Sequence, residues 1–280
     1  MGIQDIIEWA EGKAAIQTLL LSGSLAGRGP TDHLSDYDIA IFGQPFDFIA
    51  TDDWLKEISS YWVCIWDSFV VDNHTIPTRL VVFDDTCKVD FSFHPPELLS
   101  HMVKSGHLPE GYRVGYQVLL DKAGVAVHLP EPSFQGFVLP LPTRREYEKN
   151  ENEFWFEVYH VAKYLYREDL WTAKWRDHAT KEWLLQILQW EQAISLGWQF
   201  SPKDYGKGMK RWLNEVAWNR LHTCFGHFDR QDSWAALENT AQLYRETAMK
   251  VATLLGYPYN QRLDQHLTQF IKKLKESSVS

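Results

Sequence analysis

Residues 35–42 read SDYDIAIF, a run with two acidic residues in its first half and apolar residues in its second. Successive side chains of a strand point to opposite faces of its sheet. Asp36 and Asp38 therefore share one face, while Tyr37 and the isoleucines after it are buried on the other. The pattern predicts a strand of a half-buried sheet that carries two carboxylates close together.

Residues 88–93, KVDFSF, show the same alternation further along the chain. Asp90 shares a face with Lys88, and a neighbouring strand can bring it beside the first two carboxylates. Mg²⁺ prefers carboxylate and phosphate oxygens, so three acids and a nucleoside triphosphate can complete its set of ligands. Two such ions about 3.5 to 4 Å apart stabilise the attacking and leaving oxygens of a displacement. Asp36, Asp38 and Asp90 are thus the expected Mg²⁺ ligands and catalytic residues.

A glycine-serine pair, Gly23-Ser24, follows the apolar run at residues 16–21 and precedes Asp36. Because glycine has no Cβ, Gly23 lets the backbone approach a phosphate closely, and Ser24 can donate its hydroxyl group to a phosphate oxygen. Each motif alone has an ordinary alternative, namely a loop, or acids that flank a half-exposed strand. Their order along the chain favours a phosphate and metal site.

We expect an α+β protein of two domains. Residues 1–140 alternate strand-like runs with turns, which predicts a mixed β-sheet with flanking helices. Prolines gather between Leu129 and Pro142 and mark the boundary. Residues 141–280 have long helical periods, with Thr143 and Glu146 as a capping box, and predict a helical bundle. The strands are expected at residues 16–21, 37–42, 61–66, 78–83, 88–93 and 115–121.

Composition disfavours several classes of protein. The formal charge of −9 disfavours a nucleic-acid partner, because a protein that binds nucleic acid needs basic stripes on its surface. The same charge suits a cationic small molecule as ligand. The three cysteines, Cys64, Cys87 and Cys224, lie far apart, so neither a disulfide framework nor a zinc site is expected. No apolar run approaches the roughly 20 residues that span a bilayer, and the N-terminus lacks the pattern of a signal peptide. We therefore expect a cytoplasmic protein with no membrane partner.

The ordered combination of Gly23-Ser24, Asp36, Asp38 and Asp90 resembles the polymerase-beta-like nucleotidyltransferase superfamily. Further motifs, spread over nearly the full length, are similar to those of the aminoglycoside 6-adenylyltransferase (streptomycin adenylyltransferase) family. They are Asp52-Asp53-Trp54-Leu55, Leu120-Asp121-Lys122, Arg145-Glu146-Tyr147, Asn152-Glu153-Phe154-Trp155 with Val161-Ala162-Lys163 and Arg167, and Tyr257-Pro258.

This resemblance implies transfer of AMP from MgATP to a hydroxyl group of an aminoglycoside, by a nucleotidyltransferase domain followed by a helical domain that binds substrate and nucleotide. By motif position, Asp36 and Asp38 would bind Mg²⁺, and Asp90 would be either a third ligand or the general base.

The resemblance also implies contacts with ATP outside the three acids. Lys163 would meet the phosphates as a point charge, although a solvated helix lysine is the alternative. Lys203 and Tyr205 are further candidates for the same role. The family commonly has arginine directly after Gly-Ser, whereas Leu25 stands here and Arg28 is the nearest arginine. A phosphate or substrate contact is therefore either lost or relocated.

Glu151, Glu153, Trp155 and Tyr159 include spacings of three to four residues, so part of this group can share one helix face. Carboxylates and aromatic rings suit a polycationic acceptor, which makes these residues candidates for substrate binding. The alternative is that Trp155 and its apolar neighbours form the buried stripe of that helix.

We therefore expect an aminoglycoside O-adenylyltransferase that confers antibiotic resistance, with streptomycin or a related drug as acceptor. An adenylyltransferase of another acceptor, such as a lincosamide, a metabolite or a protein, is an alternative with the same chemistry. A catalytically silent nucleotide-binding module is the alternative from another class, and the retention of all three aspartates speaks against it.

Overall fold

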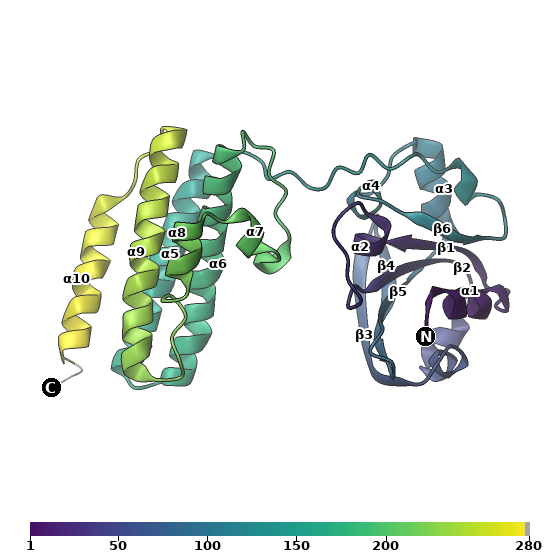
Figure 1. The fold of residues 1–280 in the computed structure, drawn as a ribbon, viewed down its shortest axis with the longest axis horizontal. Coiled ribbons are helices and arrows are strands. Elements are labelled where there is room, and N and C mark those ends of the chain that lie inside the picture. Colours follow the sequence, from purple (N-terminus) through teal and green to yellow (C-terminus); the bar gives the residue numbers. More distant parts are fainter. Residues whose placement is uncertain (278–280) are drawn as a thin grey trace. The chain divides into compact units, whose positions relative to one another are not determined.

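The computed structural model describes residues 1–277, and the chain divides into two compact units, Met1–Gly136 and Phe137–Ser280 (Figure 1). The boundary expected at residue 140 lies in the same extended, proline-rich segment as this division. None of the helices among the described residues combines the length and the apolar character that crossing a bilayer requires.

The first unit is a β-sheet with short helices packed against it. Its strands are β1 (Ile16–Ser22), β2 (Tyr37–Gly43), β3 (Tyr61–Val71), β4 (His74–Phe83), β5 (Lys88–His94) and β6 (Gln117–Asp121). Its helices are α1 (Ile3–Glu11), α2 (Gly23–Ala26), α3 (Pro96–Ser105) and α4 (Glu110–Arg113), with 3₁₀ turns η1 (Asp47–Ala50), η2 (Asp53–Glu57) and η3 (Ala126–His128).

The six strands form one sheet in the order β3-β4-β5-β2-β1-β6. β2 and β5 run parallel, whereas the other neighbouring pairs are antiparallel. The mixed sheet predicted from the sequence is therefore confirmed. In the parallel pair, Asp38 lies opposite Asp90 and Ile39 lies opposite Phe91. The pairing thus brings together two acidic segments that are far apart in the sequence.

Each face of the sheet packs against its own apolar cluster. Ile39, Ile41 and Phe91 point into one cluster, where they meet helix α1 and the turn η2. Ala40 and Phe42 point into the other, where they meet α3. Burial of a side chain of this size contributes about 1.5 to 3 kcal/mol, so the alternation along β2 determines which way the strand faces. Asp38, in step with Ala40 and Phe42, lies on the α3 face of the sheet.

Two local features differ from the expectation. Strands β3 and β4 are longer than the predicted runs at residues 61–66 and 78–83, because they continue to a turn at Asp72-Asn73 whose φ angles are 45° and 64°. Two successive positive φ values are typical of the type I′ turn that joins twisted strands. Gly23-Ser24, expected as a turn, instead begins the short helix α2.

The second unit is helical. It contains α5 (Arg144–Tyr166), α6 (Leu170–Ser195), η4 (Asp204–Gly206), α7 (Met209–Trp212), α8 (Glu215–Leu221), α9 (Arg230–Leu255) and α10 (Gln261–Ser277).

A capping box begins α5, as predicted. The Thr143 side chain accepts a hydrogen bond from the Glu146 backbone N–H at 3.2 Å, and Glu146 Oε2 accepts one from the Thr143 N–H at 2.7 Å. The core of the unit lies among α5, α6 and α9, where the rings of Phe154 and Tyr244 stack with centroids 3.5 Å apart. The helical bundle predicted for the C-terminal half is thus confirmed.

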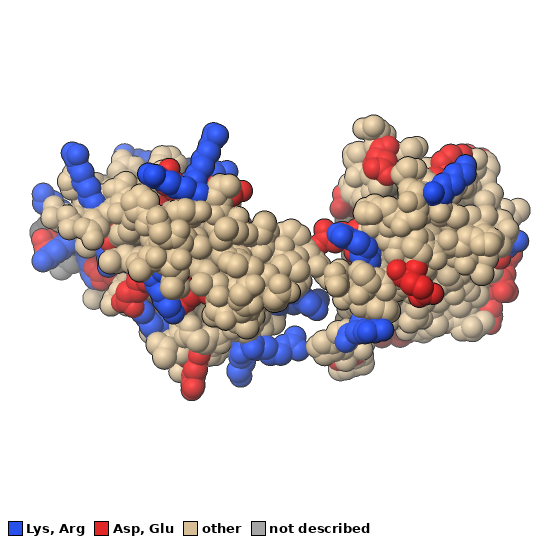
Figure 2. Space-filling view, turned by 90° about the horizontal axis from the view of Figure 1, so that it is seen from above, with Lys and Arg blue, Asp and Glu red and all other residues tan. Residues whose placement is uncertain are grey.

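Charged side chains are distributed over both units. On the face that Figure 2 shows, Lys and Arg side chains stand among Asp, Glu and uncharged residues. The described residues visible there form no continuous basic stripe of the kind that binds a nucleic-acid backbone.

Candidate active site

The three predicted metal ligands lie on neighbouring strands of the first unit. Asp38 on β2 pairs with Asp90 on β5, and Asp36 immediately precedes β2. Lys88 on β5 donates hydrogen bonds to Oδ2 of Asp36 and to Oδ2 of Asp90, each at 2.8 Å. The structure therefore brings the three acids to one region, with an ammonium group joining two of them.

Lys88 and Asp90 are held in a partly buried environment. Burial disfavours the charged form of Lys88, but its hydrogen bonds to Asp36 and Asp90 outweigh this, so the pKa of Lys88 is raised above its ordinary value. Lys88 is an ammonium group at neutral pH. Asp90 uses Oδ2 for this contact, while its Oδ1 is buried and has no hydrogen-bond partner in the described structure. A buried oxygen without a donor is destabilising, and a bound cation would relieve this.

Gly23 packs directly against Asp38 at the start of α2. Its φ of +67° lies in the left-handed region, which glycine adopts without strain. A Cβ at this position would lie 1.8 Å from Oδ2 of Asp38. Glycine is therefore required here both by the backbone conformation and by the space that the carboxylate occupies.

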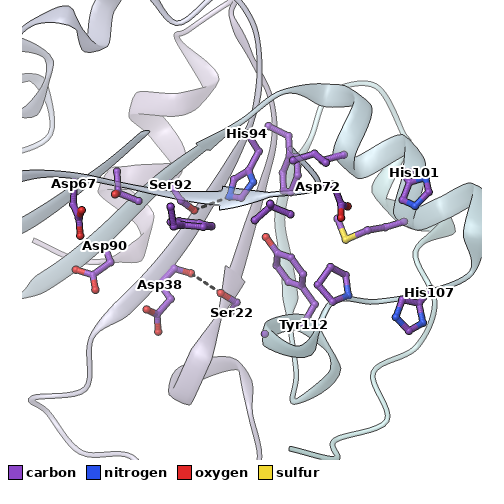
Figure 3. Close-up of a pocket in the computed structure, with 18 of the residues that line it drawn as sticks. Ser22, Asp38, Asp67, Asp72, Asp90, Ser92, His94, His101, His107 and Tyr112 are labelled. Carbon is purple, nitrogen blue, oxygen red and sulfur yellow. Dashed lines mark hydrogen bonds between the residues drawn. The ribbon is translucent and has the colours of Figure 1, made fainter. Parts of the chain in front are cut away.

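A pocket of about 670 Å³ lies beside these acids, between the sheet and the segment from α3 to α4. Figure 3 shows Asp38, Asp67 and Asp90 grouped at one end of it and His101 and His107 at the other. The apolar part of its wall comprises Phe42, Phe69, Val71, Leu80, Leu98, Met102 and Tyr112. Its combination of an acidic end and an apolar wall suits a ligand that carries both cationic groups and ring faces.

His94 lies in the pocket wall at the end of β5. Its Nε2 is 2.9 Å from the Ser92 hydroxyl group, and its ring stacks on Phe42 with centroids 4.9 Å apart. Burial lowers the pKa of His94 from 6.5 to about 4. His94 is therefore neutral at pH 7, and it adds hydrogen-bonding capacity to the pocket without adding positive charge.

The chemistry of the acids fits a hard divalent cation. All three candidate ligands are carboxylates, one Asp90 oxygen is buried without a partner, and a cationic group already joins Asp36 to Asp90. Within residues 1–277, however, no three Asp, Glu, His or Cys side chains surround one point as a ready-made metal site. The side chains must therefore move for a metal to bind all three acids.

Comparison with known proteins identifies the family. A sequence model of the family described as streptomycin adenylyltransferase matches residues 2–274. The chain belongs to the streptomycin adenylyltransferase family. The resemblance inferred from the motifs is thereby confirmed, as is the expectation of an enzyme of the nucleotidyltransferase class.

Relatives of this family match both units of the chain. The aminoglycoside 6-adenylyltransferase of Campylobacter jejuni is 27% identical, over 97% of this chain and 93% of the relative. The aminoglycoside 6-adenylyltransferase of Bacillus subtilis (strain 168) is 26% identical, over 94% of this chain and 93% of the relative. A crystal structure of an aminoglycoside 6-adenyltransferase from Bacillus subtilis is 22% identical with a TM-score of 0.49, over 98% of this chain and 97% of that one.

The residues predicted to contact ATP outside the acidic group have different surroundings. Lys163 on α5 is half-buried, with its ammonium group 4.9 Å from the centre of the Tyr164 ring. Lys203 and Tyr205 lie in the segment around η4, where Tyr205 is 98% exposed. Arg28 is exposed and stacks over Phe134 at 3.8 Å. These four contacts remain predictions.

The four predicted substrate contacts on α5 differ in exposure. Trp155 is fully buried in the core of the helical unit. Its ring therefore offers no exposed face to a ligand, in agreement with the alternative that it belongs to the buried stripe of the helix. Glu151 is also buried and accepts a hydrogen bond from the Asn260 backbone N–H at 2.8 Å. Glu153 is half-buried, and Tyr159 is exposed and stacked on Phe270.

Sequence reasoning missed several residues of the pocket wall, among them Asp67, His94 and Tyr112. Asp67 comes from β3 and Tyr112 from α4, so strand order and helix placement bring them to the pocket. His94 lies on β5 itself, four residues after Asp90 and on the same face. One signal was available: Asp67 lies within the β3 run, where an acid among apolar residues marks a face that is not packed into a core.

Proposed function

We propose that this protein transfers AMP from ATP to a hydroxyl group of an aminoglycoside such as streptomycin, with release of pyrophosphate and with Mg²⁺ as cofactor. The observation that carries the proposal is the pairing of Asp38 with Asp90 across β2 and β5, beside the pocket and against Gly23. Family membership supports the same reaction class.

The reaction is a displacement at the α-phosphorus of ATP. The acceptor oxygen forms a bond to this phosphorus as the bond to the bridging oxygen of the leaving pyrophosphate breaks. Asp36 and Asp38 would hold Mg²⁺, which neutralises charge on the phosphates. Asp90 is either a further ligand or the base that takes the proton of the acceptor hydroxyl group, and both roles suit its place in the pocket wall.

The pocket supports a cationic acceptor. Asp38, Asp67 and Asp90 supply negative charge at one end, and Tyr112 and Phe42 supply ring faces along the wall. Guanidinium and ammonium groups bind well to carboxylates and to aromatic faces. The two relatives from Campylobacter jejuni and Bacillus subtilis are both named as aminoglycoside 6-adenylyltransferases, which favours an aminoglycoside over a lincosamide, a metabolite or a protein.

The first experiment measures pyrophosphate release with MgATP and a panel of aminoglycosides that includes streptomycin, followed by the mass of the product. We expect one drug to gain the mass of one AMP. Asp38→Asn should lower the rate by at least about 10³-fold, because charge stabilisation in a closed site is lost. Asp53→Asn is the matched control, since Asp53 begins η2, which packs on the other face of the sheet.

Each result separates the candidate functions. If Asp38→Asn released pyrophosphate as fast as the wild type, the proposed catalytic role of the acids would be wrong. If pyrophosphate were released with a lincosamide or a protein and with no aminoglycoside, the protein would be an adenylyltransferase of that other acceptor. ATP binding without release for any acceptor would indicate a silent nucleotide-binding module.

A further inference from the structure

We propose that Lys88 acts as a built-in counter-cation of the acidic site, which holds Asp36 to Asp90 and weakens the binding of a divalent cation until a nucleotide arrives. This inference rests on the metal role of the aspartates in the proposed function. It assigns Lys88 a positioning role that the sequence motifs alone do not supply.

The placement of Lys88 follows from the register of two strands. Tyr37 pairs with Val89 and Asp38 with Asp90, so Asp36 and Lys88 are neighbours one step earlier along the parallel pair. Lys88 and Asp90 are two residues apart on β5 and share a face. The ammonium group of Lys88 therefore reaches both carboxylates, at 2.8 Å each, from a position that the backbone fixes.

Lys88 pairs with two of the three carboxylates that are the proposed metal ligands. Lys88 contacts Oδ2 of Asp36 and Oδ2 of Asp90, and Oδ1 of Asp90 is buried without a partner. A divalent cation at these carboxylates would lie within a few ångströms of a like charge, and a partly buried environment screens this repulsion less than bulk water does. Metal binding to the nucleotide-free protein is therefore opposed by the lysine.

A nucleotide removes this opposition. The side chain of Lys88 is 36% exposed and has a flexible four-carbon stem, so its ammonium group can leave the two aspartates without rearrangement of the sheet. A triphosphate brings several negative charges to which the ammonium group can transfer. The metal then enters together with the nucleotide.

The test is binding of Mn²⁺ alone, without nucleotide or acceptor, measured by the loss of the free-ion signal in electron paramagnetic resonance. We expect Lys88→Met to bind Mn²⁺ at least tenfold more tightly than the wild type. Lys88→Arg, which keeps the charge, should stay within threefold of the wild type. Lys56→Met is the matched control, because Lys56 pairs with Asp53 on η2 and its loss should leave Mn²⁺ affinity unchanged.

Two further variants locate the effect. Asp36→Asn in the Lys88→Met background should abolish the gain, because it removes one of the released carboxylates. Lys88→Gln, whose amide still donates a hydrogen bond, should also bind Mn²⁺ more tightly than the wild type. It replaces Lys88→Met in the test if circular dichroism shows that Lys88→Met does not fold.

Unchanged or weaker Mn²⁺ binding in folded Lys88→Met or Lys88→Gln overturns the proposal, as does a gain that survives Asp36→Asn. The Mn²⁺ titration contains no ATP and no acceptor, so its result does not depend on the adenylyl transfer proposed above. Tighter Mn²⁺ binding by Lys88→Met would therefore support the role of Lys88 even if no adenylyl transfer were found.

Discussion

At the scale of single residues, Gly23 meets two separate requirements. Its backbone has a φ of +67°, and its Cα hydrogen faces the carboxylate of Asp38, where a methyl group would lie 1.8 Å from an oxygen. Gly124 has the same φ of +67° but no atom within 4 Å of a Cβ placed there. The two glycines therefore separate the effect of backbone strain from the effect of contact with the acid.

We predict that Gly23→Ala lowers adenylyl transfer at least about 100-fold, because the new methyl group displaces Asp38 from its position, and misplacement of a reacting group by about 1 Å costs this much. Gly124→Ala should lose stability by about 1 kcal/mol from the same strain and keep its activity. Initial rates and urea unfolding of both variants check this. Activity of Gly23→Ala above a tenth of the wild type would contradict the role of the contact.

The residues found from sequence are those whose position depends on local pattern. Asp36 and Asp38 share a face because of the strand pleat, which the letters alone show, whereas the place of Asp90 beside them depends on the pairing of β2 with β5. The contact of Lys88 with Asp36 depends on parallel pairing of two distant strands, which no local period specifies. The burial of Trp155 could not be predicted, because helix spacing does not tell which face of α5 is covered by α9.

At the scale of elements, β5 carries one row of side chains from an open end to a buried end. Lys88 and Asp90 are half-buried, whereas His94, at the other end of the strand, is 5% exposed and packed between Phe42 and Phe69. The pleat of one strand thus gives an ionic site and a neutral imidazole in the same pocket wall. Burial lowers the pKa of His94, whereas the hydrogen bonds of Lys88 to Asp36 and Asp90 raise the pKa of Lys88.

This burial makes stability depend on pH. The pKa of His94 falls from 6.5 to about 4 on folding, so between these values the unfolded chain binds a proton that the folded chain does not. His94 therefore lowers the free energy of unfolding as pH falls below 6.5. Between pH 7 and pH 5 the wild type should lose about 2 kcal/mol more than His94→Gln, by the linkage relation. Urea unfolding at both pH values measures this, and equal losses in the two proteins would contradict it.

Element boundaries were predictable where a local signal sets them. The capping box of α5 was found from Thr143 and Glu146 because both partners lie within four residues. The ends of β3 and β4 were missed, because Asp72-Asn73 is a weaker turn signal than Asn-Gly and the ladder is stabilised by pairing across the hairpin. The short helix α2 was missed because glycine and serine at its start usually indicate a turn.

At the scale of the whole molecule, each unit has its own hydrophobic core. The clusters on the two faces of the sheet draw their buried residues from the range 6–129, and the cluster of the helical unit draws its own from the range 147–271. The division was predictable because prolines gather at the boundary and the periodicity changes from strand to helix there. Its position differs slightly from the expected residue 140, because Phe137 and Leu139 belong with the helical unit, where the Leu139 N–H donates to Phe200 O.

Separate cores predict separate unfolding transitions. Leu19 and Leu237 are both fully buried, one in each unit, so Leu19→Ala and Leu237→Ala are matched substitutions. Each should destabilise its own unit by about 2 to 5 kcal/mol through lost burial and a residual cavity. In calorimetry of the full chain, Leu19→Ala should lower one transition and Leu237→Ala the other. A single transition that both substitutions lower equally would show instead that the two cores unfold as one cooperative unit. The position of Asp38 on β2 and Asp90 on β5 would then depend on the stability of the helical half.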